Sequence, residues 1–270
     1  TESTPQHANS PGSRGSPVFF APAFALHCGM DFGFLSQPAF SGGGTYLDWV
    51  LSGIKWTMLV SICAWVIAFT LGSVLGVLRT TKSWWLKGPA TAYVELFRNV
   101  PLLVQMFIWY FVVPEIVPKT LGMWLKQGMP MPEFWSAVFA LGFYTASRVA
   151  EQVRSGIQSI PVGQTHAALA TGLTMPQVYR HLLLPMGYRI VIPPLTSEFL
   201  TIFKNSSVAL TIGVLELTAQ ARTISEYTFR TFEIFTLATV VYVLITMAVT
   251  VLMQLVERRL RVPGYIGTGK

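Results

Sequence analysis

The chain has 270 residues, of which 52% are hydrophobic and only 11% are charged. Soluble domains carry roughly 25% charged residues, so this composition excludes an ordinary soluble domain and favours a membrane protein. The net charge is +7, but the Lys and Arg residues lie between apolar stretches and form no single basic face, so we expect no nucleic-acid partner.

The N-terminal residues 1–43 are expected to be disordered or partly non-native. Residues 1–29 are rich in Pro, Ser and Gly, and their short apolar run is broken by Pro22, so they do not read as a signal peptide. Met30 is our hypothesis for the native start. We expect a membrane domain over residues 44–264 and a flexible tail over residues 265–270.

Five apolar stretches are long enough to cross roughly 30 Å of hydrocarbon as helices. They cover residues 56–78, 92–113, 134 to about 153, 188–213 and 235–256. Polar residues and prolines interrupt the second and the fourth stretches, at Glu95, Arg98, Pro101, Pro193, Pro194, Glu198 and Lys204. We therefore predict an all-α integral membrane bundle of five transmembrane helices.

The basic residues predict the orientation of this bundle. Twelve Lys and Arg residues fall on the side of the C-terminus and five on the other side. The side richer in Lys and Arg is normally cytoplasmic. We therefore expect the N-terminus outside and the C-terminus inside.

A polar segment lies between the third and fourth predicted spans, on the cytoplasmic side. Thr165 can cap a short helix of small residues, and Gly172 permits the left-handed backbone that ends it. Thr174 and Gln177 have the spacing of a capping box, and Pro185 is expected to end a second short helix. The alternative is an amphipathic loop that rests on the membrane surface.

The spacing of this segment resembles the EAA loop of bacterial ABC importer permeases. That loop has a small-residue helix, a Gly six positions after its first residue, and an apolar ending in Leu-Pro thirteen positions later. His166 stands where the family usually has Glu, so no salt bridge is expected from that position. The resemblance implies a cytoplasmic coupling helix pair at about residues 160–187, with ATPase-coupling residues His166, Ala167, Ala168, Gly172, Leu182, Leu184 and Pro185.

Two further runs narrow the resemblance to polar amino-acid permeases. They are VELFRNVPLLVQ at residues 94–105 and KNSSVAL at residues 204–210. Residues 93–118 and 146–185 look most like glutamate/aspartate permease subunits. The resemblance implies a multi-pass subunit of the bacterial inner membrane that imports a polar, acidic amino acid and is not itself an enzyme.

The resemblance also implies partners. A periplasmic amino-acid-binding protein would deliver the substrate, and a cytoplasmic ABC ATPase dimer would bind ATP and Mg, so this chain binds no cofactor itself. A second permease chain would complete the pathway, with a heterodimer favoured and a homodimer open. Membrane lipid surrounds the bundle.

The residues themselves suggest a substrate pathway, because an ionisable group inside a span is costly and usually functional. The candidates are Lys204, Asn205, Ser206, Glu198 and Arg98. Lys204 could pair with a substrate carboxylate. The structural alternative, which we weigh about equally, is that Lys204 pairs with a neighbouring helix while the amide and hydroxyl groups hold helices together.

Several charged residues have spacings that suit pairing along one helix. Glu95 with Arg98, and Arg148 and Arg154 with Glu151, lie at i,i+3. We favour such structural pairs over a role in the pathway, and Arg98 is the weaker pathway candidate.

Glycine and proline motifs leave two questions open. A GxxxG pattern at Gly72 and Gly76 allows close packing, either within the subunit or between subunits. Pro193 and Pro194 could break the fourth span at a pathway or simply kink it.

Other chemistries have weak support. Cys28 and Cys63 give no disulfide framework, and the four histidines lack metal-ligand spacing, so neither a metal site nor a catalytic residue is predicted. The alternative function is an ion-coupled secondary carrier or channel for small polar solutes, although no inverted repeat is visible.

Overall fold

The computed structural model describes residues 31–40, 42 and 44–260. The chain divides into two compact units, residues 1–31 and 32–270, and the fold below is that of the second. The predictions for residues 1–29 and for the tail at 265–270 therefore lie outside the described residues. Within the predicted N-terminal segment, η1 (Gly33–Ser36) is a 3-10 helix whose Phe34 side chain is buried.

The regular elements of the described residues are all helical, which confirms the predicted all-α class. The only β-type pairing among them is an isolated bridge between Pro38 and Thr45. The elements after η1 are α1 (Tyr46–Leu78), α2 (Trp84–Asn99), α3 (Leu102–Phe107), η2 (Ile108–Val112), α4 (Val113–Ile116), α5 (Lys119–Met123), η3 (Trp124–Gly128), α6 (Pro132–Gln158), α7 (Val162–Ala170), α8 (Met175–Val178), η4 (Tyr179–Leu183), α9 (Leu184–Asn205), η5 (Ser206–Ile212), α10 (Leu217–Thr228) and α11 (Thr231–Leu260).

Two helices, α1 and α11, are each long and apolar enough to cross a membrane. Two bent pairs of helices raise that number to four if each pair counts as one span. The first pair is α2 with the helices over Leu102–Ile116, bent by 106°. The second is Met175–Ile212 with α10, bent by 51°. The helix α6 matches the third predicted span in position but is not among these candidates. The predicted count of five is therefore not reproduced.

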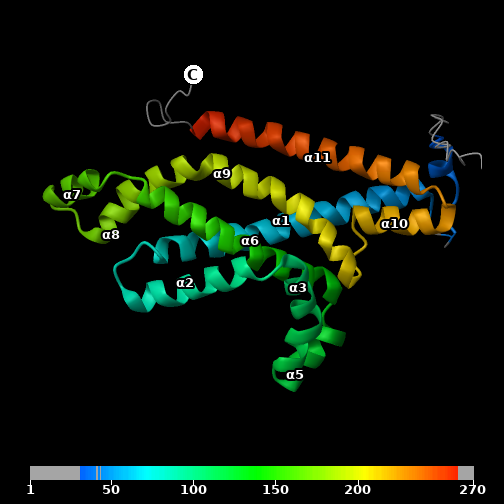
Figure 1. Cartoon of the computed structure of the whole chain (residues 1–270), viewed down its shortest axis with the longest axis horizontal. Helices are drawn as coiled ribbons and strands as arrows, with labels where there is room; N and C mark the ends of the chain where they lie inside the picture. The colour runs from blue at the N-terminus through cyan, green and yellow to red at the C-terminus, as the bar shows by residue number, and fades with distance from the viewer. Residues whose placement is uncertain (1–30, 41, 43, 261–270) are drawn as a thin grey trace, which may run out of the picture. The chain divides into compact units, whose positions relative to one another are not determined.

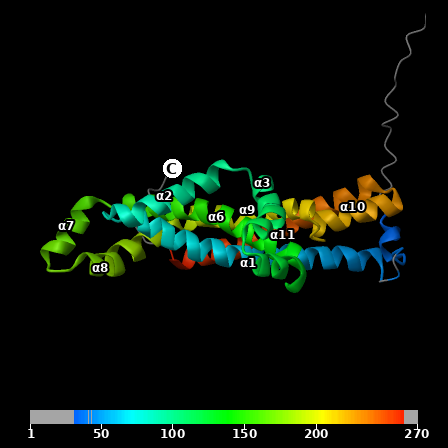
Figure 2. The same ribbon diagram turned by 90° about the horizontal axis from the view of Figure 1, so that it is seen from below.

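The second predicted span, residues 92–113, is a bent pair of helices with its break at Val100 and Pro101, where the sequence shows an interruption. The chain leaves the helix at Val100, whose ψ of 127° is extended, because Pro101 disfavours a helical residue before it. The Gln105 side chain spans this break, since its Nε2 donates to the carbonyl oxygens of Phe97 at 2.8 Å and Val100 at 3.0 Å. The helix α2 runs alongside α6, as Figures 1 and 2 show, whereas the chain from α3 to α5 extends to one side of the bundle (Figure 1).

The helices α1 and α6 lie side by side and form the tightest contact of the bundle (Figure 1). A Cβ at Gly72 would lie 2.7 Å from the Ala146 carbonyl oxygen, and a Cβ at Gly76 would lie 2.7 Å from the Val153 Cβ. Real side chains do not tolerate such distances, so only glycine fits. The GxxxG motif therefore packs within this subunit, and we call this contact the α1–α6 seam.

The fourth predicted span is interrupted at a different place from the one its prolines suggested. The helix α9 continues through Pro193 and Pro194 to Asn205. It then tightens into the 3-10 helix η5, which ends at Gly213 with a φ of 94°. The change of helix type therefore lies next to the pathway candidates Asn205 and Ser206.

Candidate functional site

The predicted coupling segment lies at one end of the bundle and begins with α7 (Figure 1). Pro161 occupies the N-cap position of this helix, so Thr165 lies inside the first turns and does not cap it, contrary to our prediction. The predicted left-handed stop is confirmed, because Gly172 has a φ of 87°. No atom would lie within 4 Å of a Cβ at this position, so the backbone conformation alone requires glycine.

The second half of the segment is capped as predicted but does not end as predicted. The Gln177 Oε1 accepts hydrogen bonds from the Thr174 N–H at 2.8 Å and from the Thr174 hydroxyl at 2.9 Å. After α8 the chain passes through the π-helix η4 directly into α9, where Pro185 lies in the first turn. Proline has no N–H for the hydrogen-bond ladder, and the change from π-helix to α-helix lies directly before it, where the ladder is already altered. The expected stop at Pro185 is therefore wrong.

The seven predicted coupling residues divide into an exposed set and a packed set. His166, Ala167, Gly172 and Pro185 are exposed, whereas Ala168, Leu182 and Leu184 are half-buried. The half-buried residues pack on a core cluster that includes Val153, Val178 and Leu183. The segment thus rests on α6 and α9 and leaves a surface of small and apolar side chains open, which also includes Val162, Leu169 and Met175.

Tyr179 attaches this segment to α1, and the sequence reasoning missed it. Its hydroxyl donates to the Thr80 carbonyl oxygen at 3.1 Å and lies 3.1 Å from the Thr80 hydroxyl. The two residues are 99 positions apart, so no local pattern could reveal the contact. The sequence shows only that a tyrosine follows Val178, which the structure places in the core.

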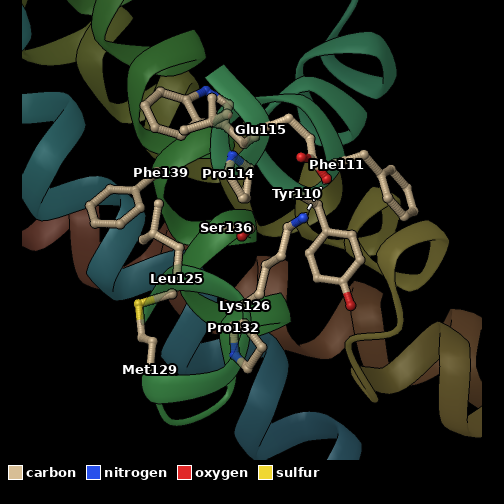
Figure 3. Close-up of a pocket in the computed structure, with 12 residues that line it drawn as sticks. Tyr110, Phe111, Pro114, Glu115, Leu125, Lys126, Met129, Pro132, Ser136 and Phe139 are labelled. Atoms are coloured by element: carbon tan, nitrogen blue, oxygen red, sulfur yellow. Dashed lines mark hydrogen bonds and ion pairs between the residues drawn. The ribbon is translucent and has the colours of Figure 1, made fainter. Parts of the chain in front are cut away.

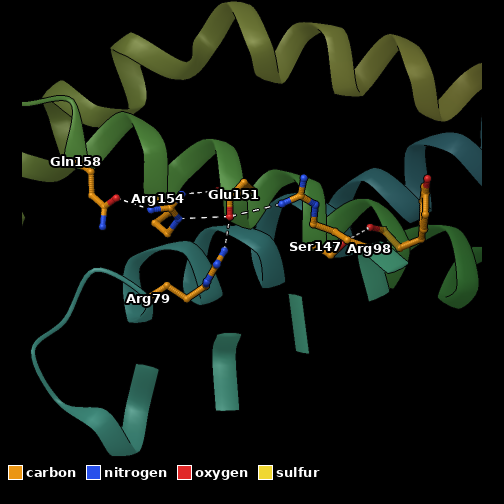
Figure 4. A network of polar contacts seen from close by, with 7 residues as sticks. Arg79, Arg98, Ser147, Glu151, Arg154 and Gln158 are labelled. Carbon is orange, nitrogen blue, oxygen red and sulfur yellow. Dashed lines mark hydrogen bonds and ion pairs between the residues drawn. The ribbon is translucent and has the colours of Figure 1, made fainter. Parts of the chain in front are cut away.

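A cluster of charges lies between the α1–α6 seam and the coupling segment, and Glu151 is its centre (Figure 4). Its carboxylate accepts from Arg79 at 2.5 Å and from the Arg154 Nε at 3.3 Å, and the Arg98 guanidinium lies 3.8 Å away. The Arg79 side chain is only 11% exposed. Three segments of the chain, the C-cap of α1, α2 and α6, are thereby tied to one carboxylate.

These contacts confirm one predicted ion pair and correct another. Arg154 pairs with Glu151 at i,i+3 as predicted. Arg98 pairs with Glu151 of another helix, and Glu95 is exposed on α2 without an ion pair to Arg98. The packing of α2 against α6 therefore determines which carboxylate Arg98 pairs with, and the i,i+3 spacing within α2 does not.

Arg148 and Glu198 extend the charged cluster from α6 to α9. Their side chains approach to 3.8 Å, and the Arg148 Nη2 donates to the Tyr144 hydroxyl at 2.8 Å. The Glu198 Oε2 is buried without a hydrogen bond among the described residues. Of the predicted pathway residues, Arg98 thus pairs with Glu151, and Glu198 pairs with Arg148.

Lys204 lies in a different part of the bundle from the charges around Glu151. It is exposed and lines a cavity of about 520 Å³ against α11. Tyr242 and three threonines, Thr239, Thr246 and Thr250, line the same cavity, with their hydroxyls donating to Glu216 and to backbone carbonyl oxygens respectively. Asn205 is half-buried, and the buried Ser206 donates to the Phe203 carbonyl oxygen at 2.7 Å. Lys204 is therefore the one candidate of this run that faces an open cavity.

Comparison with known proteins gives consistent results. Residues 68–262 match the family described as "Binding-protein-dependent transport system inner membrane component". The chain is 51% identical to the glutamate/aspartate import permease protein GltJ of Escherichia coli K12, over 87% of this chain and 96% of that protein. It is 34% identical to the probable glutamine ABC transporter permease protein GlnM of Bacillus subtilis, over 82% of this chain and 95% of that protein.

A solved structure has a similar fold. The crystal structure of an amino acid ABC transporter with histidines superposes with a TM-score of 0.68 at 30% identity, and the match covers 79% of this chain and 95% of that chain. The MetNI methionine ABC transporter in an inward-facing conformation gives a TM-score of 0.61 at 18% identity, over 80% of this chain and 96% of that chain. The latter similarity concerns the fold alone.

Proposed function

The chain belongs to the family of inner membrane components of binding-protein-dependent transport systems, and we propose that it imports glutamate or aspartate as a permease subunit of an ABC importer. The observation that carries this proposal is the 51% identity to a glutamate/aspartate import permease over nearly the whole of that relative. We further propose the bacterial inner membrane as its location, with the N-terminus outside and the C-terminus in the cytoplasm.

The work of import would be divided among several chains. A cytoplasmic ATPase dimer would bind ATP and Mg, a periplasmic binding protein would deliver the amino acid, and a second, related permease chain would complete the pathway. The open surface of the coupling segment supports ATPase docking, because exposed Ala167, Leu169 and Met175 surround the tight turn at Gly172. Movement of this surface would reach the bundle through Tyr179 and the charges around Glu151.

The charges of the bundle support an acidic substrate. Within the described part of the chain, Arg79, Arg98, Arg148 and Arg154 pair with two carboxylates, those of Glu151 and Glu198. Lys204 adds a further cation beside a line of hydroxyl groups. We propose Lys204 as a contact for a substrate carboxylate and Arg98 and Glu198 as further points of the pathway.

Reconstitution tests the function as a whole. The full chain, co-expressed with the ATPase, the second permease and the binding protein encoded beside it, is placed in liposomes with ATP inside. We expect uptake of labelled glutamate and aspartate that requires the binding protein and is competed only weakly by glutamine. Uptake by this chain alone, driven by an ion gradient, would favour a secondary carrier instead.

Substitution of Lys204 tests the substrate contact separately. Lys204→Met should lower acidic amino-acid uptake about tenfold, since a charge-assisted hydrogen bond contributes roughly 1.5–3 kcal/mol. Lys55→Met is the matched control, because it removes an equal charge from an exposed position that does not line the cavity. Equal uptake by the two variants, at normal assembly, would remove Lys204 from the pathway.

A further inference from the structure

Residues 102–128 form a lateral hairpin that packs on the start of α6 through Met106 and Trp109 and extends to one side of the bundle. The helices over Leu102–Ile116 turn by 106° from α2, and α5 and η3 bring the chain back to α6. Figure 1 shows α3 and α5 extending to one side of the bundle. Figure 1 shows the hairpin extending across the direction of α1 and α11, which have the length and hydropathy of membrane-crossing helices, so in a membrane spanned by those two helices the hairpin would lie closer to the membrane plane than to its normal.

The surface of the lateral hairpin fits a lipid environment. Its exposed large apolar side chains include Ile108, Phe111, Ile116, Met123 and Trp124, with exposures between 38% and 73%. A patch of this kind is costly in water. Tryptophan and lysine on one short segment are typical of the membrane interface, where the aromatic ring meets lipid and the ammonium group meets the headgroups.

The lateral hairpin encloses a cavity of about 300 Å³ together with the first turns of α6 (Figure 3). Its walls are largely aromatic and apolar, with Trp109, Phe139, Leu125 and Met129 among them. Ser136 also lines it, is 8% exposed, and its hydroxyl has no hydrogen-bond partner among the described residues. An apolar cavity of this size, with few polar groups in its lining, has the make-up of a ligand pocket.

The rim of the cavity carries one charge of each sign. Glu115 and Lys126 form an ion pair there, and their side chains are 68% and 43% exposed. An exposed ion pair of this kind contributes little to stability and can open to new partners at small cost. Both of its charges are therefore available to a ligand that carries an anion and a cation close together.

We propose that this cavity binds a zwitterionic phospholipid whose headgroup carries a primary ammonium group. The lipid phosphate lies beside the Lys126 ammonium, and the lipid ammonium donates to the Glu115 carboxylate. The glycerol backbone and the first acyl carbons enter the aromatic interior, where the Ser136 hydroxyl donates to an ester carbonyl. A choline headgroup carries a cation but has no N–H to donate to Glu115, and a glycerol headgroup has no cation, so neither supplies both the positive charge and the hydrogen bond.

Native mass spectrometry of the delipidated full chain in mild detergent tests this site with three lipids: phosphatidylethanolamine, phosphatidylcholine and phosphatidylglycerol. We expect phosphatidylethanolamine to be retained about tenfold more strongly than the other two, as one added charge-assisted hydrogen bond predicts. The double variant Glu115→Gln/Lys126→Met should lose this preference. The swapped variant Glu115→Lys/Lys126→Glu should lose it as well, because it places a cation beside the lipid ammonium and an anion beside the lipid phosphate.

Lys119→Met provides the matched control, since Lys119 is exposed on the same hairpin but does not line the cavity. It should retain phosphatidylethanolamine as the unaltered chain does. Equal retention of the three lipids, or an unchanged preference in Glu115→Gln/Lys126→Met, would overturn the proposal. So would a second protein chain that covers the hairpin and releases the bound lipid.

Discussion

The α1–α6 seam and the coupling segment both depend on glycine, but for different physical reasons. At Gly72 and Gly76 the backbone is ordinary helix, and the neighbouring helix leaves no space for a side chain. At Gly172 the space is open, and the left-handed φ of 87° excludes most other residues. The first region is defined by packing and the second by local conformation, so substitutions should affect the fold in one and the function in the other.

The largest effect is expected in the α1–α6 seam. Gly72→Ala and Gly76→Ala place a methyl group against Ala146 and Val153, and overpacking of this kind costs about 1–3 kcal/mol for each site. Thermal unfolding of the purified chain should shift strongly downward. Gly88→Ala in α2 is the control, because its Cβ would meet nothing closer than 4.0 Å. Equal unfolding temperatures for the seam and control variants would contradict the role of the seam.

A somewhat smaller effect is expected between the two regions, at Glu151. Glu151→Gln leaves the 11% exposed Arg79 without its carboxylate. Breaking a fully buried pair costs about 3–5 kcal/mol, and the partial exposure of this one reduces the expected cost to about 2 kcal/mol. Glu95→Gln is the control, since Glu95 is exposed and was predicted from sequence to form an equivalent pair. If the two variants lost the same free energy of unfolding, the charges around Glu151 would not stabilise the fold.

In the coupling segment, Gly172→Ala should affect transport more than stability. A left-handed conformation costs an ordinary residue about 1–2 kcal/mol, and the strain falls on an exposed turn. The unfolding temperature of the bundle should stay near that of the unaltered chain, while ATP-driven uptake falls. Gly163→Ala is the control, because its φ is not positive and its surroundings are equally open. If Gly172→Ala left uptake unchanged, this turn would have no role in coupling transport to the ATPase.

The smallest effect is expected at the link between the two regions. Tyr179→Phe removes the hydrogen bond to Thr80 and should cost about 1 kcal/mol. Tyr188→Phe serves for comparison, since the Tyr188 ring packs near Phe69 and no hydrogen bond of its hydroxyl is seen in the described part of the chain. Uptake should fall in the first variant at nearly constant assembly. A fall of equal size in both would point to a general loss of packing.

Features that depend on neighbouring residues were predictable from the sequence. The apolar runs of α1 and α11 predicted long membrane-type helices, and both are present. The capping of α8 by Thr174 and Gln177 and the left-handed turn at Gly172 follow from residues three or fewer positions apart. Pro101 was visible as an interruption, but the size of the bend there was not, because it depends on how Gln105 and α6 hold the following turns.

By itself, the sequence determined the helical class, the two long apolar helices and the local turns of the coupling segment, since hydrophobicity and backbone preference act between near neighbours. Only the tertiary structure decided that Glu151 gathers arginines from three helices, that Lys204 faces a separate cavity, and that Tyr179 reaches Thr80. Those contacts join residues up to 99 positions apart, and they depend on the register and crossing of packed helices, which no local pattern encodes.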